Sequence, residues 1–86
     1  METENRVALL ALIVRDGASV AELNELLHQY GNCIIGRMGI PYRERNVNII
    51  SVAMDAPGSA ISALSGKLGR LPGVTAKTVY APQEAL

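Results

Sequence analysis

The chain is short, balanced in charge and poor in aromatic residues. It has 86 residues, with eight Lys plus Arg against eight Asp plus Glu, one cysteine, three tyrosines and neither Phe nor Trp. This length predicts a single domain, and one cysteine excludes an internal disulfide, which favours a reducing cytoplasm. Nucleic-acid binding usually needs a basic excess and stacking rings, so direct contact with nucleic acid is not expected.

The first half predicts two strands around one helix. Residues 6–14 ("RVALLALIV") are aliphatic with β-branched members, which indicates a strand, and this longest apolar run is too short to cross a bilayer. Ser19 followed by Glu22 is typical of a capping box that begins a helix. The helix has an apolar face and ends at Gly31-Asn32; the face consists of Val20, Leu23, Leu27 and Tyr30. Residues 33–40 predict a second strand, and residues 41–46 ("PYRERN") a polar connection.

The second half repeats the pattern. Residues 47–55 predict a third strand, and Pro57-Gly58-Ser59 begins a second helix. Its apolar face consists of Ile61, Leu64, Leu68 and Leu71, and Pro72-Gly73 ends it. Residues 74–81 predict a fourth strand. The whole chain, residues 1–86, is one predicted domain, in which residues 1–5 and 82–86 are expected to be flexible tails.

The order β-α-β-β-α-β predicts an α+β fold of the ferredoxin-like type. Two right-handed crossovers joined by a hairpin place both helices on one face of a four-stranded antiparallel sheet. The first and third strands then lie in the centre, and the second and fourth at the edges. Gly36, Gly39 and Pro41 in the second strand suit an edge.

Both faces of the central strands are apolar. In the first strand Leu10, Leu12 and Val14 alternate with Leu9, Ala11 and Ile13. Two helices cover only one face, and an exposed second face would normally be polar. An uncovered apolar patch of this size is rare in a soluble monomer. We therefore expect a homo-oligomer, a dimer or a tetramer, that forms through the open face or the strand edges.

The stretch "ALSGKLGRLPGV" (residues 63–74) contains a Gly-Lys pair but does not predict a nucleotide site. A phosphate-binding loop needs Gly five residues before that pair and Ser or Thr after it, whereas Ile61 and Leu68 occupy these positions. The stretch also lies near a helix C-terminus, where carbonyls point outward. Gly66 and Gly69 are explained only by a fraying end or by close approach of a neighbouring strand or chain.

Few residues predict chemistry. His28 and Cys33 are the only imidazole and thiol, too few for a metal site within one chain, so a site would have to form across an oligomer interface. No nucleophile–base set or carboxylate pair is indicated, so we expect no enzyme and no cofactor. The densest polar cluster could bind an anion or a partner, or simply be solvated; it comprises Arg37, Tyr42, Arg43, Glu44, Arg45 and Asn46. Asp16-Gly17 could bind a small molecule at a helix start, or form only a turn.

The motifs "GRMGIPYRE" and "LSGKLGRLPGV" make the chain resemble the iron-only hydrogenase system regulators, from about Val7 to Tyr80. That family is similar to ACT domains and to the C-terminal domain of nickel-responsive regulators, which are ferredoxin-like and oligomeric. The resemblance implies an ACT-like fold and a small-ligand site at Asp16, Gly17 and Ala18, near the subunit interface. Nickel-responsive regulators use more His than this chain has, so a comparable nickel site is not expected. Only residues 1–5 precede the first predicted strand, so we expect no DNA-binding segment of the ribbon-helix-helix type here.

Two hypotheses of function follow. The first is a non-enzymatic, cytoplasmic, oligomeric regulatory module that senses a small ligand at the subunit interface and makes no contact with membranes. The second is a metal-responsive module that uses His28 and Cys33 across an interface. The sequence does not decide between them.

Overall fold

The computed structural model describes residues 4–82, so the predicted tails lie largely outside the described residues, although Asn5 already belongs to the first strand. The strands are β1 (Asn5–Val14), β2 (Ile34–Tyr42), β3 (Val47–Pro57) and β4 (Val74–Tyr80). The helices are α1 (Val20–Gln29) and α2 (Gly58–Gly69), with single 3₁₀ turns η1 (Gly17–Ser19), η2 (Gly31–Cys33) and η3 (Arg43–Arg45). No helix in this described part is long and apolar enough to span a membrane.

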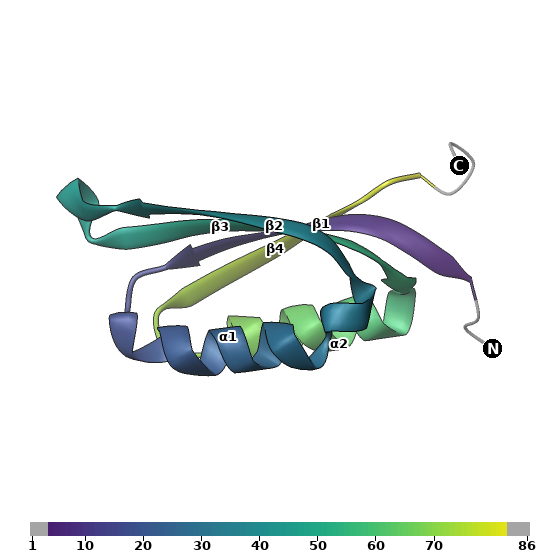
Figure 1. The fold of residues 1–86 in the computed structure, drawn as a ribbon, viewed down its shortest axis with the longest axis horizontal. Helices are drawn as coiled ribbons and strands as arrows, with labels where there is room; N and C mark the ends of the chain where they lie inside the picture. The colour runs from purple at the N-terminus through teal and green to yellow at the C-terminus, as the bar shows by residue number, and fades with distance from the viewer. Residues whose placement is uncertain (1–3, 83–86) are drawn as a thin grey trace.

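The four strands form one antiparallel sheet in the order β2-β3-β1-β4. Both helices lie against the same face, below the sheet in Figure 1, and the opposite face is bare. This arrangement confirms the predicted ferredoxin-like, ACT-like fold, with the first and third strands in the centre. The β2–β3 hairpin extends beyond the helices at one end of the molecule (Figure 1).

The hydrophobic core lies between the sheet and the helices. Leu10 pairs with Val52, and Leu12 pairs with Ile50, so these side chains point to the same face, where they are buried. The helices complete the core with Leu23, Leu27, Ile61, Leu64 and Leu68. These are the helix positions predicted from the 3.6-residue period. Each large side chain removed from water contributes about 1.5–3 kcal/mol to folding.

The other face, which we call the open face, is apolar and exposed. Its pairs include Leu9 with Val79 and Ile40 with Ile49. Six large apolar side chains on it are between 39% and 64% exposed: Leu9, Met38, Ile40, Tyr42, Ile49 and Val79. Polar residues on this face are fewer and include Thr75 and Lys77 of the edge strand β4 and Ser51 and Asp55 of β3. The central strands are therefore apolar on both sides, yet only one side is covered.

The predicted helix start at Ser19 is confirmed, since α1 begins at Val20, but the predicted capping box does not form, because the 3₁₀ turn η1 precedes the helix. Asp16 has extended backbone angles, and its carboxylate accepts a hydrogen bond of 3.0 Å from the Ala18 N–H, so it caps η1. Ser19 already has helical angles, and its buried hydroxyl donates a hydrogen bond of 2.6 Å to the Pro72 carbonyl. The serine therefore joins the two helix-flanking turns rather than capping α1.

The β2–β3 hairpin is longer than predicted. β2 continues through Pro41 to Tyr42, which shortens the predicted polar connection to η3 and Asn46. Asn46 has a left-handed backbone (φ 55°), a conformation that asparagine tolerates better than most residues. At the start of β2 its pairing with β3 shifts register between Ile34 and Gly36. Such irregularities are common in edge strands, and β2 is an edge strand.

The glycines of α2 are not explained by tight packing. A Cβ on Gly66 would lie 3.5 Å from the Arg70 side chain, and one on Gly69 would lie 3.8 Å from the Ala76 Cβ, both ordinary contacts. Gly73 differs, because its φ is +73° and a Cβ there would lie 2.6 Å from the Asp16 Cβ. The turn before β4 therefore requires glycine, whereas α2 does not.

Candidate functional site

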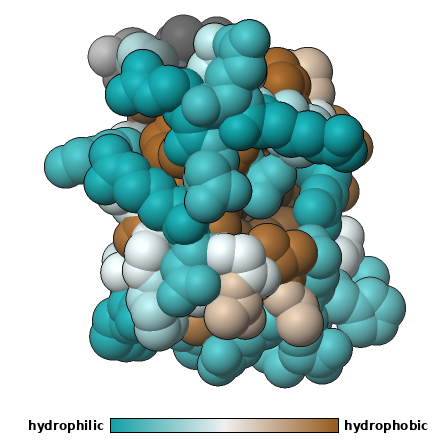
Figure 2. All heavy atoms as spheres, turned by 90° about the vertical axis from the view of Figure 1, so that its left-hand side faces the viewer, coloured by the Kyte–Doolittle hydropathy of each residue, from teal (hydrophilic) through white to brown (hydrophobic). Residues whose placement is uncertain are grey.

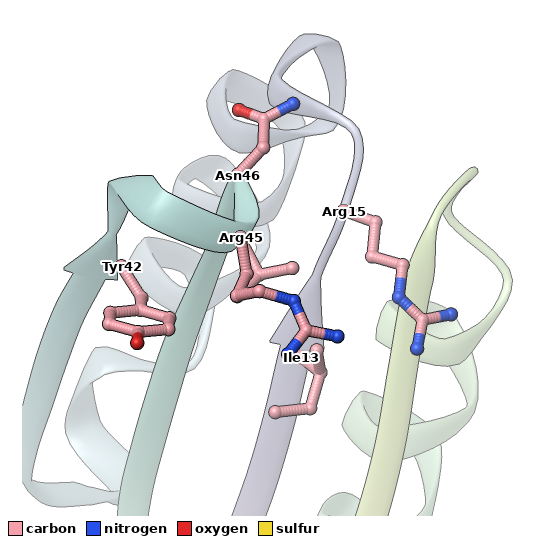
Figure 3. A pocket seen from close by; sticks show the side chains of 6 residues that line it. Ile13, Arg15, Tyr42, Arg45 and Asn46 are labelled. Carbon is pink, nitrogen blue, oxygen red and sulfur yellow. The ribbon is translucent and has the colours of Figure 1, made fainter.

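A cavity of about 550 Å³ lies at one end of the open face, where the β1–α1 turn approaches the tip of the β2–β3 hairpin. Figure 3 shows the side chains that line it. They are Ile13, Arg15, Tyr42, Arg45, Asn46 and Val47. The cavity is an open depression rather than an enclosed chamber. It joins residues far apart in the sequence, so its composition depends on the sheet order.

Strand alternation positions the floor and one wall. Ile13 lies on the open face, and Arg15 follows two residues later, so it continues the same side of β1 past the strand end. Val47 pairs with Tyr42, which brings both side chains to the open face at the base of the hairpin. The η3 turn and the left-handed Asn46 then direct Arg45 back over Ile13 (Figure 3).

The cavity is electropositive. Neither the Arg15 nor the Arg45 guanidinium has a hydrogen bond or an ion pair with any residue between 4 and 82. The carboxylate of Glu44, beside Arg45 in the sequence, accepts a hydrogen bond of 2.8 Å from the Tyr42 hydroxyl. Glu44 itself does not line the cavity. Figure 2 looks at this end of the molecule and shows mostly hydrophilic side chains with hydrophobic atoms between them.

A smaller cavity of about 200 Å³ adjoins the same two loops. Its lining includes Arg15, Gly17, Tyr42, Arg43 and Asn46. The structure therefore brings the predicted turn site next to the predicted arginine-rich cluster, which the sequence analysis had treated separately. In the turn, Asp16 and Ala18 are exposed, and the Asp16 carboxylate is engaged by the Ala18 N–H. The charged side chains that line this smaller cavity are Arg15 and Arg43.

Arg37 does not join this cluster. Its guanidinium donates a hydrogen bond of 3.0 Å to the Asn24 side-chain oxygen, so it links β2 to α1 on the helix side of the sheet. There it lines a cavity of about 250 Å³ between α1 and the β2–β3 hairpin, above Ile50 and Gly39. The contact fixes the edge strand against the helix layer, away from the arginines of the hairpin tip.

His28 and Cys33 lie near the other end of α1. His28 is exposed on the helix, and Cys33 is partly buried in η2, where it packs against the core. Among the described residues no group of three or more His, Cys, Asp and Glu could hold a metal ion. The geometry within one chain therefore adds nothing to the metal-responsive hypothesis.

Sequence reasoning missed Arg15 as a site residue. Its signal was available, because Arg15 continues the two-residue alternation of Leu9, Ala11 and Ile13 past the end of the strand. The pairing of that strand end with the hairpin tip was not available from local pattern. Ile13 was predicted as a member of an apolar face and Val47 as the start of a strand, but neither as the floor of a cavity.

Known proteins similar to this chain bear on its identity. The sequence model of the TM1266-like family, described as "Iron-only hydrogenase system regulator, putative", matches residues 6–78. The structure of uncharacterized protein TM1266 from Thermotoga maritima is 39% identical and has a TM-score of 0.88, covering 92% of this chain and 100% of that one. No curated protein matches the chain.

Two more distant structures share the fold alone. The C-terminal domain of the MgtC protein from Mycobacterium tuberculosis is 13% identical with a TM-score of 0.70, covering 94% of this chain and 93% of that one. A formyltetrahydrofolate deformylase from Pseudomonas putida KT2440 is also 13% identical, with a TM-score of 0.62, covering 88% of this chain and 29% of that one.

The family match spans most of the described residues and agrees with the 39% identical structure, so the chain belongs to the TM1266-like family of iron-only hydrogenase system regulators.

Proposed function

We propose that the chain is a non-enzymatic regulatory module of an iron-only hydrogenase system that self-associates through the open face and senses a small ligand at the resulting subunit boundary. The family description is that of a regulator. The observation that carries the proposal is the adjacency of an uncovered apolar face and an electropositive cavity at its end.

The open face has the character and the size of an interface. Most of its large exposed side chains are apolar, and large apolar patches on soluble proteins mark interaction sites. The molecule measures 41 × 21 × 18 Å, and the sheet runs along the longest axis above the helices (Figure 1). The face is thus comparable with the roughly 800 Å² that each partner contributes to a standard interface. A second copy in a twofold arrangement would bury this face against its own equivalent.

The proposal of ligand sensing is supported by the position of the larger cavity on the open face. The cavity formed by Ile13, Arg15 and Arg45 opens on the same face as the apolar patch, so association would place it at the subunit boundary. The neighbouring turn at Asp16, Gly17 and Ala18 borders the smaller cavity. A ligand bound at this boundary would contact residues that set the stability of the assembly. Ligand binding would therefore shift association by mass action.

Self-association is tested by placing a charge on the open face. We expect size-exclusion chromatography with light scattering to give a mass above that of the 9.1 kDa monomer for the wild type. Ile49→Glu should return the protein to monomers, because a carboxylate buried in an apolar interface is costly. Ala21→Glu, on the exposed outer side of α1, is the matched control and should leave the mass unchanged. A wild type that stays monomeric up to millimolar concentration contradicts the proposal.

Ligand sensing is tested by thermal-shift screening of the wild type with amino acids, other small carboxylates and inorganic anions. We expect at least one class to raise the melting temperature in the millimolar range, and to change the mass measured by light scattering. No stabilisation by any of these classes would remove the sensing part of the proposal, while leaving self-association to its own test.

A further inference from the structure

We propose that the larger cavity binds a small aliphatic carboxylate that carries no amino group. Arg15 and Arg45 hold the carboxylate, and Ile13 and Val47 contact the aliphatic body. This inference rests on the proposed function, because it names the ligand class of the proposed sensing site. It is carried by the composition of the cavity wall rather than by any resemblance.

The charges of the cavity call for an anion. Two guanidinium groups line one cavity of about 550 Å³, and neither is engaged by another described side chain. In Figure 3 the Arg45 guanidinium lies above Ile13, and the Arg15 guanidinium lies beyond it on the same side of the sheet. Like charges in one depression repel each other, and an anion placed between them relieves that repulsion. The planar guanidinium donors also match both oxygens of a carboxylate.

The floor of the cavity calls for an apolar body. Ile13 and Val47 belong to the apolar alternation of β1 and β3, and the Tyr42 ring stands beside them on β2. An inorganic anion would pair with the arginines but leave the apolar floor exposed to water. A short aliphatic chain covers it and gains the free energy of removing apolar surface from water. The volume lies within the range that small-molecule cavities usually have.

The wall discriminates against an amino group. Its six residues include two cations and no carboxylate, so a ligand ammonium would lie near Arg15 and Arg45 with no ionic partner. Glu44 is directed to the Tyr42 hydroxyl, and Asp16 to the Ala18 N–H. A free amino acid therefore pays for an unpaired positive charge that the matching carboxylate does not carry. We therefore predict that the cavity binds a free amino acid more weakly than the carboxylate of the same shape without the amino group.

Three ligands of nearly equal shape test this: isocaproate, the neutral isocaproamide and leucine, which is isocaproate with an added amino group. Titration of the full chain followed by amide NMR should show isocaproate binding, with the largest shifts at Ile13, Arg45 and Val47. We expect the amide and leucine to bind about tenfold more weakly, because each loses a charge-assisted contact or adds an unpaired charge. Inorganic phosphate should also bind more weakly than isocaproate.

Two arginines of the same turn provide a matched pair of variants. Arg45 lines the larger cavity, whereas Arg43 lines only the smaller one. Arg45→Gln should weaken isocaproate binding about tenfold, and Arg43→Gln should leave it within about twofold of the wild type. Arg15→Gln should act like Arg45→Gln. All three side chains are exposed, and the melting temperature of each variant checks that it folds.

The inference is overturned if leucine binds as tightly as isocaproate, if isocaproamide does, or if Arg43→Gln and not Arg45→Gln weakens binding. It is also overturned if isocaproate does not bind while an amino acid or inorganic anion stabilises the protein, an outcome that keeps the proposed function. Failure of every ligand class would remove the proposed sensing and this inference together, and the mass of the wild type would still report self-association separately.

Discussion

The two faces of the sheet are built from the same strands and from similar residues, yet they differ in burial. Leu10 is fully buried under the helices, whereas Leu9, its neighbour in β1, is 43% exposed on the open face. The same holds in β3 for Ile50 and Ile49. Hydrophobicity alone therefore does not determine which side chains form the core; coverage by α1 and α2 does. Within one chain the open face has no second layer, and the proposed self-association would supply it.

The largest effect is expected when each of the two neighbouring leucines is replaced by alanine in turn. Leu10→Ala should lower the free energy of unfolding by about 2–5 kcal/mol, because it leaves a cavity in a packed core. Leu9→Ala should cost less than about 1 kcal/mol at concentrations where the protein is monomeric. Urea denaturation followed by circular dichroism measures both.

The same pair reports on association. If the open face pairs with a second copy, the cost of Leu9→Ala should increase with protein concentration, because unfolding of an oligomer is linked to its dissociation. The cost of Leu10→Ala relative to the wild type should stay nearly constant. Equal costs for the two variants at low concentration would break the comparison, since they would mean that the open face is covered within the monomer.

The turn between α2 and β4 lies against the β1–α1 turn, and this contact constrains Gly73. Gly73→Ala should lower stability by about 2 kcal/mol or more, because alanine is strained at φ +73° and its Cβ would collide with Asp16. Gly31→Ala is the control, since no atom lies within 4 Å of a Cβ there. A thermal melt in which both variants behave alike would show that the contact between the Asp16 and Gly73 turns is not needed.

The smallest expected effect has the opposite sign. Gly66→Ala should raise the free energy of unfolding by up to about 1 kcal/mol, because alanine is the better helix former and the site has room for its Cβ. Gly69→Ala, at the end of α2, should gain less. If instead Gly66→Ala lowers the mass measured by light scattering, then a neighbouring chain approaches α2 closely and the interface extends beyond the open face.

Local sequence pattern predicted most of the fold. The strands, the two helices and the core positions follow from periods of two and 3.6 residues, which depend only on backbone geometry. The start of α1 was predicted at the right residue, but its cap was not, because the Ser19 hydroxyl reaches Pro72, a residue far along the chain. Asp16 has the same local capping ability, and only the contact between the two turns shows which residue caps.

The candidate site was predicted only in part. The arginines of the hairpin tip and the turn at Asp16 were visible as clusters, because charged and glycine-containing turns are local features. Strand order and register decide that these two clusters meet at one end of the sheet. They also decide that Arg37 lies apart from them and that Arg15 lines the cavity. The sequence by itself determined which side chains could be buried and which could carry charge. Tertiary structure alone decided which face is covered and which side chains of different strands and turns meet, because that depends on contacts between residues distant in the chain.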